Sequence, residues 1–68
     1  MMELMVNGKK QALPEGLTVT QLLAQLKVVP ERVVVEVNLD ILKRAQFPQV
    51  TLKPGDQVEI VQMIGGGA

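Results

Sequence analysis

A single short amphipathic segment, Thr18 to Leu26, sets the strongest limit on how this chain can fold. Apolar residues recur in it at i, i+3, i+4 and i+7, the spacing that places side chains on one face of a helix. A helix of about nine residues is not stable alone in water, so it must pack on another element. Because β-favouring runs make up much of the remaining chain, that element is a sheet, and we predict an α+β domain. The apolar positions are Val19, Leu22, Leu23 and Leu26.

The sequence marks both ends of this predicted helix. Thr18 and Gln21 have the three-residue spacing of a capping box, in which each residue bonds to the backbone N–H of the other. At the other end, Pro30 disfavours helical geometry at Val29. We therefore expect the helix to begin after Thr18 and to end at the Val28-Val29-Pro30 segment.

Before the helix, two short runs predict a β-hairpin. Glu3–Val6 is the first strand, and Lys9–Leu13 is the returning one. Asn7-Gly8 between them is a strong hairpin signal, because both residues tolerate the positive φ of a tight turn. The polar character of the second run favours a solvated face or an edge strand.

After the helix, Val33–Val37 is the clearest strand. It is apolar on both faces except at Glu36, which favours a central strand beneath the helix. Ile41-Leu42 predicts a further short strand, followed by an irregular or single-turn helical stretch. We expect Phe47 to fill the core under that loop.

The chain closes with a turn at Pro54-Gly55-Asp56 and a β-favouring run from Gln57 to Ile64. This order of elements favours a β-grasp fold, a mixed sheet of four to five strands with one main helix packed across it. In that arrangement the first and last strands lie parallel at the centre of the sheet. We expect residues 1–64 to form the domain and residues 65–68 to form a flexible tail.

Composition excludes several classes of function. The chain has 68 residues, enough for one small core. It has no Cys and no His, so thiolate chemistry and the usual neutral-pH base are absent, and we expect neither catalysis nor a metal site. With zero net charge and one aromatic residue, it does not resemble a nucleic-acid-binding protein. Nothing in it predicts a signal peptide or a membrane helix, so we expect a cytoplasmic protein.

The glycines at the end of the sequence admit two interpretations. Gly65, Gly66 and Gly67 are consecutive, and a run without side chains cannot pack. Such a tail is commonly a frayed end or a linker. Alternatively, it is a thread narrow enough to enter a partner's closed site and to present a terminal carboxylate there.

Several motifs together decide how this tail is best interpreted. They are Asn7-Gly8, the helix start Thr18-Val19-Thr20-Gln21-Leu22-Leu23, the strand end Val35-Glu36-Val37-Asn38, and the run from Lys53 to Val61 leading to Gly-Gly. In this combination they resemble the ThiS family of ubiquitin-like sulfur carriers over nearly the whole chain.

The resemblance implies a mechanism that acts on the main-chain terminus. An E1-like activating enzyme (ThiF-type), using ATP and Mg²⁺, would adenylate the carboxylate of Gly67. Sulfur delivered through a persulfide would then replace AMP and give a thiocarboxylate. A thiazole synthase (ThiG-type) would take that sulfur for the thiazole ring of thiamine. The chain itself would bind no cofactor and would not be an enzyme.

The resemblance also implies roles for the neighbouring residues. Gly65 and Gly66 would thread into the activating enzyme, where a Cβ would collide with the walls. The candidate partner contacts are Val61, Met63 and Ile64, although Val61 could equally pack in the core.

Ala68 departs from the family pattern, in which the chain ends at the second glycine. It is either a native extension removed by a metal-dependent peptidase or a remnant of cloning. Some trimmed carriers serve cysteine or methionine (homocysteine) synthesis instead of thiamine synthesis, and that alternative stays open. A ubiquitin-like protein modifier and a plain interaction domain with an inert tail are further alternatives.

Overall fold

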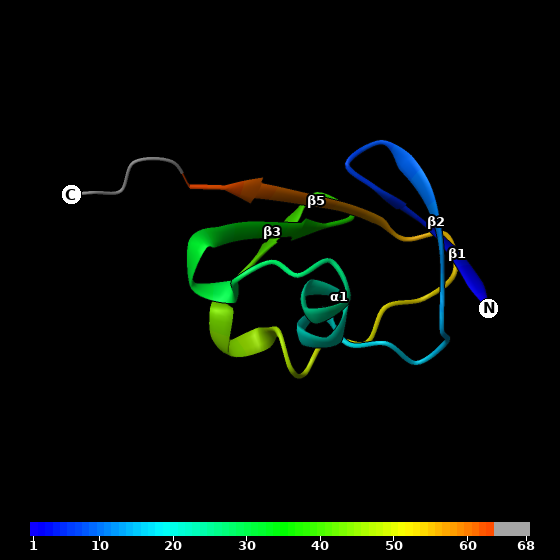
Figure 1. Ribbon diagram of the computed structural model, residues 1–68, viewed down its shortest axis with the longest axis horizontal. Helices are drawn as coiled ribbons and strands as arrows, with labels where there is room; N and C mark the ends of the chain where they lie inside the picture. The colour runs from blue at the N-terminus through cyan, green and yellow to red at the C-terminus, as the bar shows by residue number, and fades with distance from the viewer. Residues whose placement is uncertain (64–68) are drawn as a thin grey trace.

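The computed structural model of the chain describes residues 1–63, which form a five-stranded sheet crossed on one face by a helix (Figure 1). The strand order is β2-β1-β5-β3-β4. This is the predicted ubiquitin-like β-grasp fold. In chain order the elements are β1 (Met2–Val6), β2 (Lys9–Leu13), α1 (Val19–Gln25), the 3₁₀ turn η1 (Pro30–Arg32), β3 (Val33–Val37), β4 (Asp40–Leu42), the 3₁₀ turn η2 (Arg44–Gln46) and β5 (Gln57–Gln62).

The last strand occupies the centre of the sheet. β5 pairs in parallel with β1, with Met5 opposite Gln57, and antiparallel with β3 on its other side. The predicted parallel pairing of first and last strands is therefore confirmed. β3, predicted to be central, lies one position away from the centre, because β5 is inserted between it and the N-terminal hairpin.

Two tight turns reverse the chain, and both have positive φ at two successive residues. Asn7 (φ 51°) and Gly8 (φ 80°) join β1 to β2, as the sequence predicts. Asn38 (φ 51°) and Leu39 (φ 74°) join β3 to β4 in the same way. Turns of this kind match the right-handed twist of the strands they connect. Leucine is an unusual residue for the second position, because its Cβ is crowded at positive φ.

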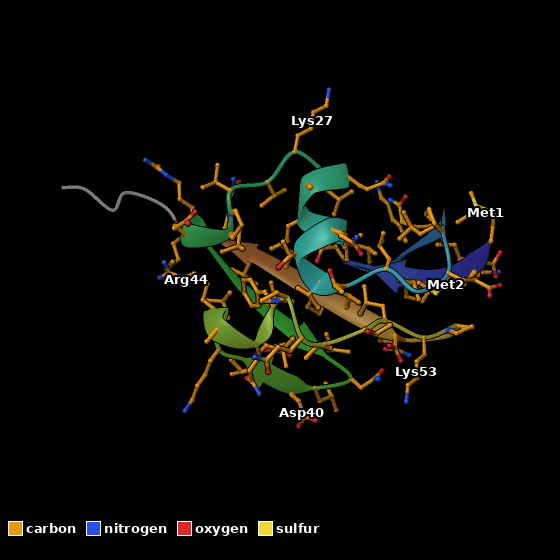
Figure 2. All side chains as sticks on the ribbon, turned by 90° about the horizontal axis from the view of Figure 1, so that it is seen from below. Met1, Met2, Lys27, Asp40, Arg44 and Lys53 are labelled. Carbon is orange, nitrogen blue, oxygen red and sulfur yellow. The ribbon has the colours of Figure 1, made fainter. Side chains whose placement is uncertain are left out.

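The start of α1 agrees with the sequence, but its end does not. The Gln21 N–H donates to Thr18 Oγ1 (3.2 Å), and the Thr18 N–H donates to Gln21 Oε1 (2.9 Å), which completes the capping box. The length is close to the predicted nine residues, but the helix ends at Gln25 with Leu26 as its C-cap, and not at the Val28-Val29-Pro30 segment. Lys27, just beyond the end of α1 (Figure 2), adopts a left-handed conformation (φ 59°), and the N–H of Val28 bonds to the carbonyl of Leu23 (2.9 Å). This is a Schellman-type ending, formed without the usual glycine.

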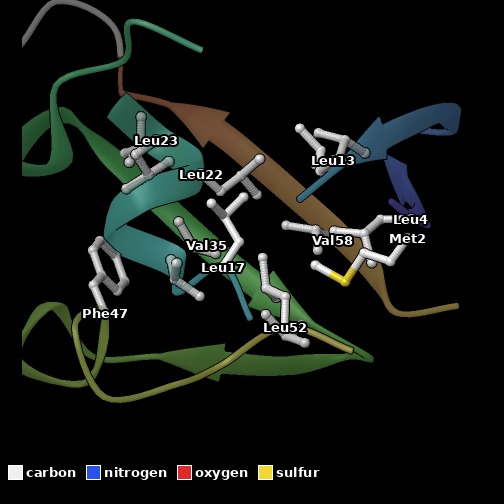
Figure 3. Packing of buried hydrophobic residues seen from close by; sticks show 14 residues of the cluster. Met2, Leu4, Leu13, Leu17, Leu22, Leu23, Val35, Phe47, Leu52 and Val58 are labelled. Atoms are coloured by element: carbon white, nitrogen blue, oxygen red, sulfur yellow. The ribbon is translucent and has the colours of Figure 1, made fainter. Parts of the chain in front are cut away.

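The core lies between α1 and the sheet (Figure 3). Alternate residues of β1 and β3 point into it, and the helix contributes its apolar stripe. Phe47 is buried beside the helix, so its predicted role as a core residue is confirmed. The buried apolar residues are Met2, Leu4, Val6, Leu13, Leu17, Val19, Leu22, Leu23, Val33, Val35, Val37, Phe47, Leu52 and Val58. No helix within residues 1–63 is long and apolar enough to cross a membrane.

We predict that replacing Leu39 with glycine stabilises the fold. A left-handed conformation costs an L-residue roughly 1–2 kcal/mol, a cost that glycine does not have. Glycine is also more flexible in the unfolded chain, and this lowers the free energy of unfolding by roughly 0.5–1 kcal/mol, so only part of the gain remains. The side chain is 88% exposed, so little packing is lost. Urea unfolding of Leu39→Gly should show a gain of about 0.5 kcal/mol.

Leu39→Ala is the matched control, because it removes most of the side chain but keeps the Cβ. Its stability should stay close to that of the parent chain. An equal gain in both variants would show that exposure of the leucine side chain, and not the turn conformation, limits stability at this position.

Candidate functional site

The candidate site begins where β5 ends, at the end of the molecule opposite the N-terminus (Figure 1). The ladder between β3 and β5 extends from the Val37–Val58 pair to the Val33–Gln62 pair. One further bond follows, from the Met63 N–H to the carbonyl of Arg32 (2.8 Å). The strand was predicted to reach Ile64 but ends at Gln62. The sheet therefore holds the chain by hydrogen bonds as far as Met63.

Two asparagine side chains fix the position of β5 within the sheet. Asn7 Oδ1 accepts from the N–H of Ile60 (2.7 Å). Asn38 Oδ1 accepts from the N–H of Gln57 (3.0 Å), and its Nδ2 donates to Asp56 Oδ1 (3.0 Å). Each asparagine stands in a hairpin turn on one side of β5. The two turns thus do more than reverse the chain, because they also bond to the strand that leads to the candidate site.

Sequence reasoning assigned Asn7 to a turn but missed the hydrogen bonds from the two asparagine side chains to β5. The missed signal is the choice of asparagine at both positive-φ positions. Glycine would satisfy the backbone there equally well, but only a residue such as asparagine adds a side-chain amide that can reach a neighbouring strand.

The predicted partner contacts that the structure describes are exposed. The side chain of Val61 is 58% exposed and lies opposite Val34 of β3, on the sheet face away from α1. Met63 is 52% exposed just beyond the strand. Of the two interpretations of Val61, the structure therefore supports the surface position and not the core position.

The remaining predicted site residues lie outside the described part of the chain. They are Ile64, Gly65, Gly66, Gly67 and Ala68. Their roles, and the division of the chain into a domain and a tail at residue 64, stay predictions. Within residues 1–63 the structure contains no group of three or more acidic, His or Cys residues placed to hold a metal ion.

With this geometry in view, the sequence can be compared with those of known proteins. The profile of the ThiS family matches residues 2–67. The chain belongs to the ThiS family. A crystal structure of the thiamine biosynthesis protein ThiS from Geobacter metallireducens superposes with a TM-score of 0.85 at 46% identity, covering 97% of this chain and 100% of that one. The sulfur carrier protein ThiS of Escherichia coli K12 is 32% identical over 66 residues, 97% of this chain and its own entire length.

Larger proteins also contain a matching stretch. A thiazole synthase of Paramagnetospirillum magneticum is 40% identical over 67 residues, which is 98% of this chain but 21% of that protein. A thiazole synthase of Magnetococcus marinus is 38% identical over 66 residues, again a fifth (20%) of its length. This chain therefore spans only about a fifth of the thiazole synthases that it matches.

We predict that the side-chain oxygen of Asn7 contributes measurably to stability. Asn7→Gly keeps the turn conformation but removes the acceptor for the Ile60 N–H, and the loss of one hydrogen bond costs about 1 kcal/mol. Asn7→Asp keeps both an acceptor oxygen and the tolerance of positive φ, so it should stay near the parent chain. Urea unfolding of the two variants provides the measurement. Equal stability of Asn7→Gly and the parent chain would show that the hydrogen bond between Asn7 and Ile60 contributes nothing to the free energy of unfolding.

Proposed function

We propose that this chain is a sulfur carrier of thiamine biosynthesis and that Gly67 bears the sulfur as a thiocarboxylate. Membership of the ThiS family carries the proposal, because the family match includes the three glycines and ends at Gly67. The names of the compared proteins favour thiamine over cysteine or methionine synthesis, since they are thiamine biosynthesis proteins and thiazole synthases.

The proposed chemistry takes place in two stages at the carboxylate of Gly67. A terminal carboxylate has a pKa near 3.5 in model peptides, so at neutral pH it is ionised and nucleophilic. In the active site of an E1-like enzyme, one carboxylate oxygen attacks the α-phosphorus of Mg²⁺-bound ATP, and pyrophosphate leaves. This gives an acyl adenylate whose carbonyl carbon is open to attack.

In the second stage the outer sulfur of a persulfide attacks that carbon, and AMP leaves with the electron pair of the C–O bond. The carrier is then joined to its donor through an S–S bond. Attack by a thiol on the donor-side sulfur breaks this bond and releases the thiocarboxylate. The acceptor that we propose is a thiazole synthase, which uses the sulfur for the thiazole ring.

The geometry of the described residues supports a division of roles, in which partners recognise residues 1–63 (the body) and the residues after Met63 (the tail) carry the reacting group. Met63 is hydrogen-bonded to Arg32 and stands four residues before Gly67. An extended segment of that length spans at most about 14 Å. The reactive site of each partner must therefore lie within this distance of the position where Met63 docks. Glycine suits the intervening positions, because a chain without Cβ atoms passes through a narrow channel.

Partner recognition then falls to the surface around Val61 and Met63. Both side chains are exposed beside the start of the tail, where the E1-like enzyme and the thiazole synthase must each approach. Ala68, if native, has to be removed by a peptidase first, because adenylation needs the free carboxylate of Gly67.

We predict that a chain ending at Gly67 gains sulfur when it is incubated with its activating enzyme, ATP and a persulfide donor. Its intact mass should rise by the difference between one sulfur and one oxygen atom. Gly67→Val in the same shortened chain should lower the rate of sulfur loading at least 100-fold, since misplacement of reacting groups by about 1 Å can have that effect. Its unfolding midpoint should not change, because the sheet and the core are formed by residues among 1–63 and the proposal assigns position 67 to chemistry alone.

A chain shortened by one more residue, to Gly66, serves as the matched control. It still ends in glycine but no longer reaches as far, so it should load slowly or not at all. Equal loading of this control would show that Gly67 is not the attachment residue. Transfer of the chain to a lysine of another protein, without gain of sulfur, would instead favour a protein modifier.

A further inference from the structure

The face of the sheet opposite α1 carries an ordered set of unpartnered side chains on its two inner strands. Successive side chains of a strand point to opposite faces, so the residues that alternate with the buried Val35 and Val58 point away from the helix; of these, Glu36 is half-buried and Val34, Glu59 and Val61 are exposed. Strand register places Val34 opposite Val61 and, two residues along, Glu36 opposite Glu59. Ile41 of β4 lies opposite Glu36 on its other side.

The two glutamates form a cross-strand pair of like charge. Residues directly opposite in an antiparallel pair have Cβ atoms roughly 4.5–5.5 Å apart, and like charges at that spacing destabilise a sheet. Within residues 1–63 the one salt bridge shorter than about 4 Å joins the Met1 amino group to Glu15, so neither Glu36 nor Glu59 has a salt-bridge partner in the described fold. The repulsion between the two carboxylates is therefore not offset by a salt bridge among the described residues.

Apolar side chains border the glutamate pair on two sides. Val61 is 58% exposed and Ile41 is 68% exposed, and Val34 lies between them in the strand order at 36%. We call Val34, Glu36, Ile41, Glu59 and Val61 the open-face patch. These side chains together suit the binding of an arginine. The two carboxylates can accept hydrogen bonds from the planar guanidinium, and the aliphatic side chains can pack against the arginine stem.

We propose that the open-face patch docks on a thiazole synthase through an arginine of that enzyme, which lies between Glu36 and Glu59. This inference rests on the proposed function. The thiazole synthase is the favoured occupant because proteins of that name contain a stretch similar to nearly all of this chain, so a domain of this kind works within them. Docking at the patch also places Met63, two residues beyond Val61, against the enzyme, and so directs the tail into it.

Charge-neutralising variants test this docking, with the full-length chain and the thiazole synthase of the same organism as the binding partners. Glu36→Gln and Glu59→Gln should each weaken binding about tenfold, because each removes one carboxylate from a shielded charge pair. Their urea midpoints should rise or stay unchanged, since each variant relieves the repulsion. The affinity of the parent chain should also fall with added salt more steeply than that of either variant.

Glu15→Gln is the matched control, because it removes the same charge near the N-terminus and should leave binding unchanged. Unchanged binding by both open-face variants overturns the inference, and so does weaker binding accompanied by a lower urea midpoint. Weaker binding to the activating enzyme alone assigns the patch to that partner and also overturns it.

Sulfur loading of the chain ending at Gly67 separates this inference from the proposed function. If that chain loads but the parent chain does not bind the synthase, the docking inference fails and the carrier function stands. If the shortened chain does not load, the carrier function itself fails.

Discussion

The insertion of β5 between β1 and β3 is the interaction on which the rest of the structure depends. It brings together the first and last strands of the described chain, β1 from Met2 and β5 to Gln62, which pair in parallel. Closing so long a loop costs entropy, which the core between the sheet and α1 must offset. β5 itself contributes one fully buried residue, Val58, and its last residues are exposed. The end of the strand is therefore held by its backbone pairing with β3, which extends to Gln62 and suits the proposed carrier role because it fixes the position of the chain just before the glycines.

The parts of this arrangement that follow from local chemistry could be predicted from the sequence. Asn7-Gly8 encodes its turn through the conformations open to the two residues, and the capping box at Thr18 needs only a three-residue spacing. The burial of Phe47 and the parallel pairing of β1 with β5 followed from hydrophobic pattern and element order. Each of these features depends on a signal contained within a few residues or within the sequence of elements.

Other features could not be predicted because tertiary contacts decide them. The Schellman-type end of α1 places Lys27 at positive φ, a conformation that lysine does not favour by itself. Packing of the following segment against the core overrides that preference. At Leu39 the pairing of β3 with β4 imposes the positive φ, because Val37 lies opposite Asp40 and only two residues join them. The bonds from Asn7 and Asn38 to β5 also depend on tertiary structure, since they join residues up to 53 positions apart. For the candidate site, the sequence located Val61 and Met63 near the tail, but strand register was needed to show which residues share their face.

The proposed use of an exposed sheet face for docking and of the terminal glycines for chemistry has a consequence for the order of events. Four residues span at most about 14 Å, so in this proposal a partner reaches Gly67 only while residues 1–63 are docked nearby. A carrier that serves both an activating enzyme and a sulfur acceptor must therefore leave one before it engages the other whenever the two require the same face. Tight binding to either would slow this exchange, because affinity among related complexes is set mainly by the dissociation rate. In the proposed docking, two carboxylates supply much of the specificity of a small patch, and electrostatic complementarity of this kind speeds association and selects the partner.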